Sequence, residues 1–145
     1  MADQTSSTIT IAAPPATIMD VIADFPAYPQ WAQGMRKAEV LSTFPDGRAK
    51  EVAFEIAEGP IKDSYTLTYD WHGNDAVHWS LVEGKILKRL DGTYALTPRG
   101  NVTEVTYRLE VELHIPMIGM LRRKAEKVII DSALRGLKKR VESLP

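Results

Sequence analysis

One carboxylate and a nearby phenol are the side chains of this sequence best suited to chemistry. Asp63 falls on the inward-facing positions of an otherwise apolar strand, two residues before Tyr65. A carboxyl group and a phenol on the inner face of a sheet are suited to general acid–base catalysis, such as enolisation followed by loss of water. The other interpretation places Asp63 at a strand end, beside the turn at residues 58–60 and in contact with water. Both interpretations stay open, so Asp63 and Tyr65 are weak catalytic candidates.

Aromatic residues recur at inward-facing positions. Tyr65, Tyr69, Tyr94 and Tyr107 would either offer phenol groups to a bound molecule or simply pack, with each hydroxyl reaching water or a backbone carbonyl. The same two alternatives apply to the tryptophans, which would either stack on a ligand or fill the core; they are Trp31, Trp71 and Trp79.

The histidines do not form a metal-binding pattern. His72 lies in a turn, His78 is on the outward positions of its strand, and His114 follows a strand end, so none pairs with another at ligand spacing. The sequence also lacks the Gly-x-Ser-x-Gly elbow of a serine nucleophile and the glycine-rich loops that hold nucleotide phosphates. We therefore expect neither a metal site nor a cofactor.

Composition narrows the classes of function further. The chain has 145 residues, which predicts a single domain over residues 1–145. Its 18 basic and 19 acidic residues give a net charge of −1, which argues against a nucleic-acid partner. The absence of cysteine excludes disulfides and thiolate metal sites and fits a reducing compartment. With no signal-peptide pattern in residues 1–8 and no apolar run of about 20 residues, we expect a cytoplasmic protein.

The hydrophobic periodicity predicts an α+β domain built on one antiparallel sheet. A strand at residues 8–11 and a helix at residues 16–23 come first, followed by a short helical segment from Phe25 to about Gly34. Period-two alternation then runs through about six further strands, separated by turns that include residues 45–47, 58–60, 72–75 and 98–101, and one of these strands is expected to begin after Asp91 and Gly92. One apolar and one polar face indicate an antiparallel sheet with one side in water.

A single long helix is expected at residues 119–143, with a length of about 37 Å. Residues spaced by three and four define its expected inward stripe: Ile118, Leu121, Ala125, Val128, Ile129, Ser132, Ala133, Gly136, Leu137 and Val141. The small residues of this stripe would either allow a close backbone approach or leave space. The basic clusters at residues 122–124 and 138–140 are typical of a solvated helix face, and they would also suit anionic lipid headgroups, hence a peripheral membrane contact.

These elements and several local motifs resemble one superfamily along nearly the whole chain. The motifs are DFPAYPQW at residues 24–31, LDGTYAL at residues 90–96, VTEVTY at residues 102–107, and Pro116 before the last helix. In this order they resemble the START-like and polyketide cyclase/dehydrase-like (SRPBCC) superfamily. That resemblance implies the helix-grip fold, in which a curved antiparallel sheet of six or seven strands surrounds a long C-terminal helix.

The resemblance also implies a cavity between the sheet and the last helix. Relatives use it for lipids, isoprenoids or polyketides, so the expected function is binding of a hydrophobic small molecule. The alternative is a polyketide cyclase or dehydratase of the aromatase type. The expected ligand-binding residues are Trp31, Phe54, Tyr65, Leu67, Tyr69, Trp79, Leu81, Tyr94, Tyr107, Leu109, Met117, Leu121, Ala125, Val128, Ile129 and Ser132. The oligomeric state is not predicted.

Overall fold

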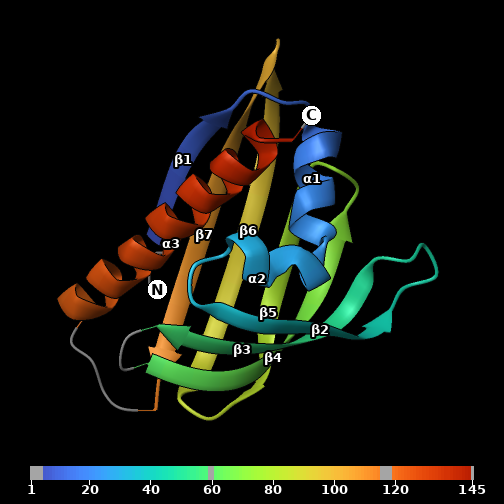
Figure 1. Ribbon diagram of the computed structural model, residues 1–145. Helices are drawn as coiled ribbons and strands as arrows, with labels where there is room; N and C mark the ends of the chain where they lie inside the picture. The colour runs from blue at the N-terminus through green and yellow to red at the C-terminus, as the bar shows by residue number, and fades with distance from the viewer. Residues whose placement is uncertain (1–4, 59–60, 115–118, 145) are drawn as a thin grey trace.

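A computed structural model describes residues 5–58, 61–114 and 119–144 of the chain. Its elements are, in order, β1 (Thr5–Ile11), α1 (Pro15–Ala23), the 3-10 helix η1 (Phe25–Ala27), α2 (Tyr28–Trp31), β2 (Met35–Thr43), β3 (Ala49–Glu58), β4 (Ile61–His72), β5 (Ala76–Gly84), β6 (Leu87–Arg99), β7 (Val102–Leu113) and α3 (Gly119–Glu142). Figure 1 shows α3 crossing one face of a strongly bent sheet, with α1 and α2 beside it on the same face. The predicted helix-grip architecture is confirmed.

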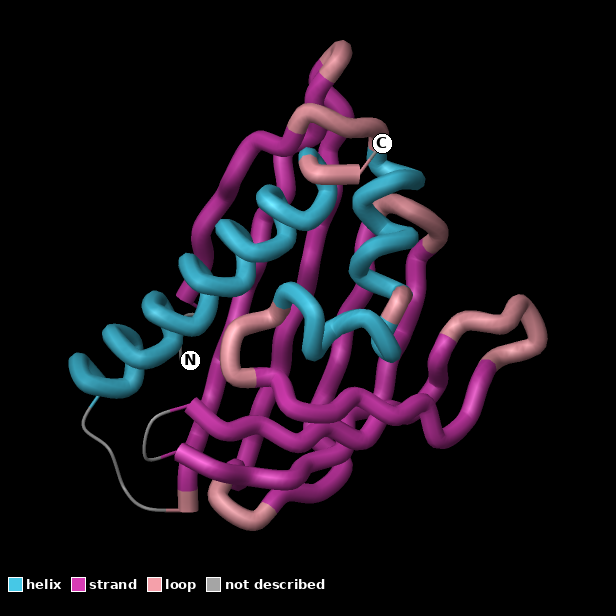
Figure 2. The backbone as a smooth tube through the Cα atoms, in the orientation of Figure 1, coloured by secondary structure: helices cyan, strands magenta, loops and turns pink. Residues whose placement is uncertain are grey.

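The sheet contains seven antiparallel strands in the order β1-β7-β6-β5-β4-β3-β2. The first strand therefore pairs with the last one, and every other neighbour in the sheet is also a neighbour in the chain (Figure 2). The hairpin turns carry glycines with positive φ, among them Gly47 at +92° and Gly100 at +66°, a conformation that L side chains rarely adopt. Pro116 lies outside the described residues, and so do residues 59 and 60 of the predicted turn at residues 58–60.

Strand register gathers aromatic side chains on the inner face of the sheet. Directly opposed residues include Phe54 with Tyr65, Tyr69 with Trp79, and Tyr94 with Tyr107. All six side chains are buried. Because side chains alternate between the two faces of a strand, their polar neighbours point outward into water.

The short helices cover one end of this aromatic face. Pro15 begins α1, at a position where the missing N–H breaks no helical hydrogen bond. The fully buried Phe25 of η1 lies with its ring centroid 4.9 Å from that of Tyr69 and 6.0 Å from that of Phe54. Such tilted and edge-on ring contacts are favourable, so η1 and α2 pack over β3 and β4.

Helix α3 packs on a different stripe from the one predicted. Leu137 and Val141 are buried as expected, but in the first half of the helix the buried residues are Glu126 and Ile130. Leu121, Val128 and Ile129 of the expected stripe are instead 53%, 63% and 45% exposed. The expected stripe is wrong in this half of the helix because it was chosen by hydrophobicity alone, which puts Glu126 on the solvent side.

Hydrogen bonds explain why Glu126 lies inside. The Thr5 hydroxyl donates to Glu126 Oε1 at 2.6 Å, and the Val111 backbone N–H donates to Oε2 at 2.7 Å. A buried carboxylate is tolerated when both of its oxygens are bonded in this way. Glu126 therefore connects α3 to β1 and β7 at once.

The strand expected to begin after Gly92 begins earlier, at Leu87. Gly92 lies inside β6, opposite Trp79 on β5, and it is buried. A Cβ atom built at Gly92 would come within 2.3 Å of the Trp79 indole ring. The glycine is needed because the indole occupies the space of its missing side chain.

Candidate functional site

The structure brings half of the expected ligand-binding residues together on the inner face of the sheet. The buried ones are Phe54, Tyr65, Leu67, Tyr69, Trp79, Tyr94, Tyr107 and Leu109. Trp31, Leu81 and Ser132 are half-buried, whereas Leu121, Ala125, Val128 and Ile129 are exposed on α3. Met117 lies outside the described residues.

All five tyrosines of the chain meet in the interior. Tyr94 and Tyr107 are in edge contact, with 4.7 Å between ring centroids, and the Trp79 ring lies 5.2 Å from Tyr94 and 5.5 Å from Tyr107. Tyr69 reaches the same indole at 5.9 Å. The fifth, Tyr28 of α2, did not figure among the expected site residues because it lies in a proline-rich helical segment without a clear period.

The tyrosine hydroxyls differ in their partners. Tyr28 donates to the Ile22 carbonyl oxygen at 2.5 Å. The hydroxyls of Tyr65, Tyr69, Tyr94 and Tyr107 have no hydrogen-bond partner within the described part of the chain, although each residue is buried. Among the described residues, two side-chain atoms are fully enclosed and have no hydrogen-bond partner: Trp31 Nε1 and Arg122 Nε. Because no tyrosine oxygen is in that set, each of the four hydroxyls borders space that water can enter.

Burial raises the pKa of all five phenols above the ordinary value of 10.0. Removal from water disfavours the phenolate, which is the largest cause in every case. The neighbouring phenols raise the pKa of Tyr69 further, and the Asp63 carboxylate raises that of Tyr65. The site is therefore lined by neutral phenols at physiological pH.

Asp63 is buried beside this cluster, and its carboxylate is occupied. Oδ1 accepts hydrogen bonds from the backbone N–H groups of Ser64 and Lys85, at 2.8 and 3.2 Å. Oδ2 accepts from those of Ile86 and Leu87, at 3.2 and 3.3 Å. The expectation of a water-exposed strand end is wrong, since the residue is only 6% exposed. Three of these four donors, at residues 85–87, lie in the connection between β5 and β6 or at its end, so the carboxylate ties that connection to β4.

The flank of α3 that faces α2 combines close contacts with uncovered apolar groups. Ser132 donates to the Gln33 side chain at 3.2 Å, and a Cβ at Gly136 would lie 3.4 Å from the Trp31 carbonyl oxygen. These small residues therefore allow close approach of the α2 segment. Ile129 and Ala125 lie about one and two turns before Ser132 on the same flank, and both are exposed.

Half-buried aliphatic residues also lie at the ends of the inward rows of the sheet. They are Ile56, Leu81, Leu90 and Leu113, and each packs against the core while staying partly exposed. Of these, only Leu81 was an expected site residue. Strand parity could have identified the other three, because each lies on the inward positions of its strand.

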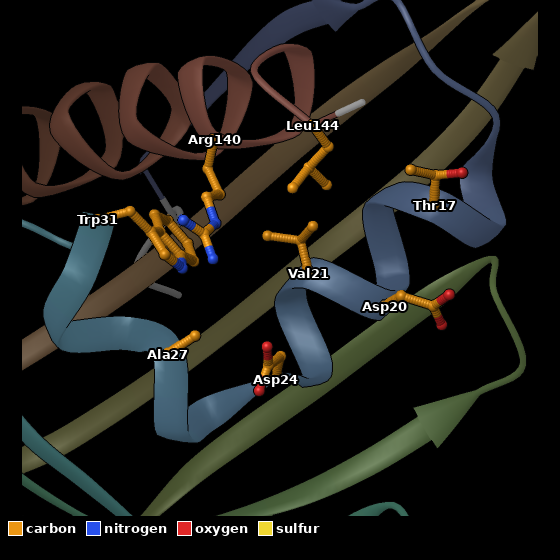
Figure 3. A pocket seen from close by; sticks show the side chains of 8 residues that line it. All are labelled: Thr17, Asp20, Val21, Asp24, Ala27, Trp31, Arg140 and Leu144. Atoms are coloured by element: carbon orange, nitrogen blue, oxygen red, sulfur yellow. The ribbon is translucent and has the colours of Figure 1, made fainter.

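A separate pocket of about 270 Å³ opens between α1, α2 and the end of α3. It is lined by Thr17, Asp20, Val21, Asp24, Ala27, Trp31, Arg140 and Leu144. Figure 3 shows the Trp31 ring beside the Arg140 guanidinium, with the two aspartates on the α1 side. The pocket shares only Trp31 with the expected site.

Two further findings concern metals and membranes. Within residues 5–58, 61–114 and 119–144, no group of three or more potential ligands could hold a metal ion. In the same residues, no helix combines the length and the apolar character of a membrane span.

Comparison with known families identifies the family to which the chain belongs. The sequence model of the family described as "Polyketide cyclase / dehydrase and lipid transport" matches residues 11–138. The chain belongs to this family. The predicted resemblance to START-like and polyketide cyclase/dehydrase-like proteins is thereby confirmed. No curated protein matches the sequence significantly.

Solved structures show how closely the fold of this family member follows that of other chains. A START superfamily protein from Mycobacterium smegmatis superposes with a TM-score of 0.92 at 23% identity, over 99% of this chain and 100% of the other. A Thermus thermophilus protein gives 0.80 at 22% identity, over 97% of both chains. The Zhui aromatase/cyclase from a Streptomyces species gives 0.78 at 15% identity, over 96% and 93%. At these identities the likeness shows the fold alone.

We propose that Asp63 is structural, and a stability measurement tests this. Asp63→Asn replaces one acceptor oxygen by an NH₂ group that faces two backbone donors, so we expect a loss of about 2–3 kcal/mol in the free energy of unfolding. Asp70→Asn on the same strand is the matched control, because its side chain is 69% exposed. An unchanged urea midpoint for Asp63→Asn would contradict the structural role.

The buried phenols predict a specific alkaline behaviour. Each has a higher pKa folded than unfolded, so its contribution to stability is complete below about pH 10 and is lost as the pH rises above that value. We expect no tyrosine to ionise near pH 10 in the native protein, followed by joint ionisation as the fold opens. Ultraviolet titration of phenolate, with circular dichroism in parallel, measures both; early ionisation of any tyrosine without unfolding would show that its ring is not buried.

Proposed function

We propose that the chain binds a hydrophobic small molecule, of lipid, isoprenoid or polyketide type, between the inner face of the sheet and α3. The observation that carries the proposal is that apolar side chains stay uncovered on both elements. On the sheet these are Ile56, Leu81, Leu90 and Leu113, and on the helix Ala125 and Ile129. Membership of a family described by cyclase, dehydrase and lipid transport activities supports it.

The packing of α3 explains why these groups are left uncovered. The helix makes its main contacts with β1, β7 and α1, and fewer with α2, so it covers one side of the bent sheet. The aromatic residues of β3 and β4 are instead covered by η1 and α2 through Phe25 and Tyr28. An apolar ligand would bury the remaining aliphatic surface, at about 25 cal/mol for each Å² removed from water.

The hydrogen bonds of Asp63 are the reason why we propose ligand binding, and not catalytic turnover, as the function. A polyketide cyclase or dehydratase of the expected kind would use Asp63 as its acid or base, yet both oxygens of that carboxylate accept two backbone hydrogen bonds each. A proton transfer at either oxygen would first break bonds that hold the β5–β6 connection. The Tyr65 hydroxyl has no hydrogen-bond partner among the described residues, and it belongs to the proposed binding site.

An environment-sensitive dye tests ligand binding. We expect 1-anilinonaphthalene-8-sulfonate to fluoresce strongly with the native protein and to be displaced by a fatty alcohol. Ile129→Asp should weaken dye binding about ten-fold, because it places a charge on the uncovered flank. Val128→Asp is the matched control, since Val128 projects from the side of α3 opposite the buried Glu126 and Ile130 and should change affinity less than about two-fold.

The opposite pattern would overturn the proposed site. Equal weakening by both variants would indicate dye adsorption to the helix surface. No dye binding to the folded protein, together with no displaceable ligand, would remove the proposed function itself.

We also propose that the first turns of α3 contact an anionic membrane surface. The helix carries eight basic and three acidic residues, whereas the whole chain has a net charge of −1. Met120 and Leu121, beside Arg123 and Lys124, are 76% and 53% exposed. Apolar groups next to clustered cations suit a surface of anionic lipid headgroups.

Vesicle sedimentation tests this contact. We expect binding to vesicles of phosphatidylcholine with phosphatidylglycerol, weaker binding at high salt, and none to phosphatidylcholine alone. Arg123→Glu with Lys124→Glu should abolish binding, whereas Lys50→Glu with Lys62→Glu, on exposed sheet positions, should reduce it less. Binding that ignores lipid charge, or no binding to either vesicle, would refute the contact.

A further inference from the structure

The pocket between α1, α2 and the end of α3 carries opposite charges on opposite walls. Asp20 and Asp24 lie on the α1 side, and the Arg140 guanidinium comes from α3 (Figure 3). Among the described residues, no ion pair of 4.0 Å or less joins Arg140 to either aspartate. Arg140 Nη2 instead donates to the Gln30 side-chain oxygen at 3.3 Å. The two kinds of charge in this pocket therefore do not neutralise each other.

The α1 wall of the pocket is suited to a cation. Asp20 and Asp24 are four residues apart, so their carboxylates lie on one side of the helix end and repel each other. Neither carboxylate has a hydrogen-bond or ion-pair partner within the described part of the chain. Asp24 also caps the C-terminal end of α1, where the helix dipole adds partial negative charge. A protonated amine bound there would relieve the repulsion.

The opposite wall offers hydrogen-bond donors. The half-buried Arg140 places its guanidinium beside the Trp31 ring (Figure 3). Trp31 Nε1 is enclosed and has no acceptor in the residues that the structure describes, which is unfavourable for an N–H group. A carboxylate accepts from both groups, and with a guanidinium it forms charge-assisted hydrogen bonds. A small turn of the indole would direct its N–H to the same carboxylate.

Apolar surface lies between the charged walls. Val21, Ala27 and Leu144 line the pocket together with the Trp31 ring. The volume of about 270 Å³ corresponds to about nine water molecules. A ligand of this size can carry one short apolar side chain in addition to two charged groups.

We propose that this pocket binds a free α-amino acid with an apolar side chain. Its ammonium group lies between Asp20 and Asp24, and its carboxylate accepts from Arg140 and Trp31 Nε1. An amine without the carboxylate would leave the donors unpaired, and an acid without the ammonium group would leave the aspartates unpaired. The inference goes beyond the proposed function, because the pocket is a second site with a charged ligand.

Three probes with one apolar side chain test the inference. They are L-leucine, 3-methylbutylamine, which lacks the carboxylate, and 4-methylpentanoate, which lacks the ammonium group. Near pH 7, where both groups are charged, we expect leucine to bind with a Kd of about 1 mM. Each analogue should bind about five-fold more weakly, because one charged contact is lost. Titrations followed by nuclear magnetic resonance measure all three affinities.

The indole N–H signals locate the bound ligand. Leucine should shift the signal of Trp31, which the Trp31→Phe variant assigns. The signal of Trp71 is the internal control, because its Nε1 already donates to the Ala49 carbonyl oxygen at 2.7 Å and should not respond.

Variants then assign each end of the ligand. Arg140→Gln should weaken leucine and 4-methylpentanoate about five-fold and leave the amine unchanged. Asp20→Asn with Asp24→Asn should weaken leucine and the amine and leave 4-methylpentanoate unchanged. Arg135→Gln on α3 and Asp75→Asn beside β5 are matched controls, since both residues are exposed and neither lines the pocket. Neither control should alter any of the three affinities.

Three results would overturn the inference. One is the absence of leucine binding at about 20 mM, well above the expected Kd. Another is an analogue that binds as tightly as leucine, because one wall of the pocket would then contribute nothing. The third is binding that no pocket variant changes, which would place the probes elsewhere. The pocket variants leave the inner face of the sheet intact, so they should bind the dye like the parent, and the dye experiment tests the proposed function independently.

Discussion

The attachment of α3 to β1 is the constraint on which the rest of the structure depends. Polar contacts tie one flank of the helix to the strand along its whole length: Glu126 to Thr5, Asp131 to Ser7, Lys138 to the Thr10 carbonyl oxygen, and Glu142 to the Ala12 N–H. The apolar stripe from Ile130 to Val141 points into the core beside this line. Because one flank is fixed by directional bonds, the helix can neither roll nor slide toward the centre of the sheet.

The opposite flank of α3 is shaped by that attachment. Near the C-terminal end, Ser132 and Gly136 let the α2 segment approach closely. Toward the N-terminal end nothing comparable within the described residues covers Ala125 and Ile129, and the inward rows of the sheet end in half-buried aliphatic residues. A helix fixed to one side of a bent sheet therefore leaves half-buried aliphatic residues on the rest of the inner face, where we propose that a ligand binds. The glycine at position 92 contributes in the same way, since it admits the Trp79 indole that the tyrosines surround.

The sequence carried enough information for the architecture because strand alternation, turn chemistry and the long helix are local signals. Three features needed the third dimension. Glu126 is buried only because Thr5 and Val111, distant in the chain, bond its carboxylate. Asp63 was correctly placed on the inner face, yet its four backbone donors could not be foreseen from spacing. Gly92 was expected to precede its strand, because a glycine kept for a neighbouring ring has the same sequence signal as one that interrupts a strand.

The interior also shows where packing and chemistry diverge. As ring contacts, the side chains of Tyr65, Tyr69, Tyr94 and Tyr107 are interchangeable with phenylalanine, and within the described residues no protein group bonds their hydroxyls. The packing of these rings therefore does not require the hydroxyls. Tyr28, whose hydroxyl donates to the Ile22 carbonyl oxygen, lies outside the sheet, on the helical segment that packs over it. The four hydroxyls without a partner in the described part of the chain all lie on the strands, on the inner face where we propose that a ligand binds.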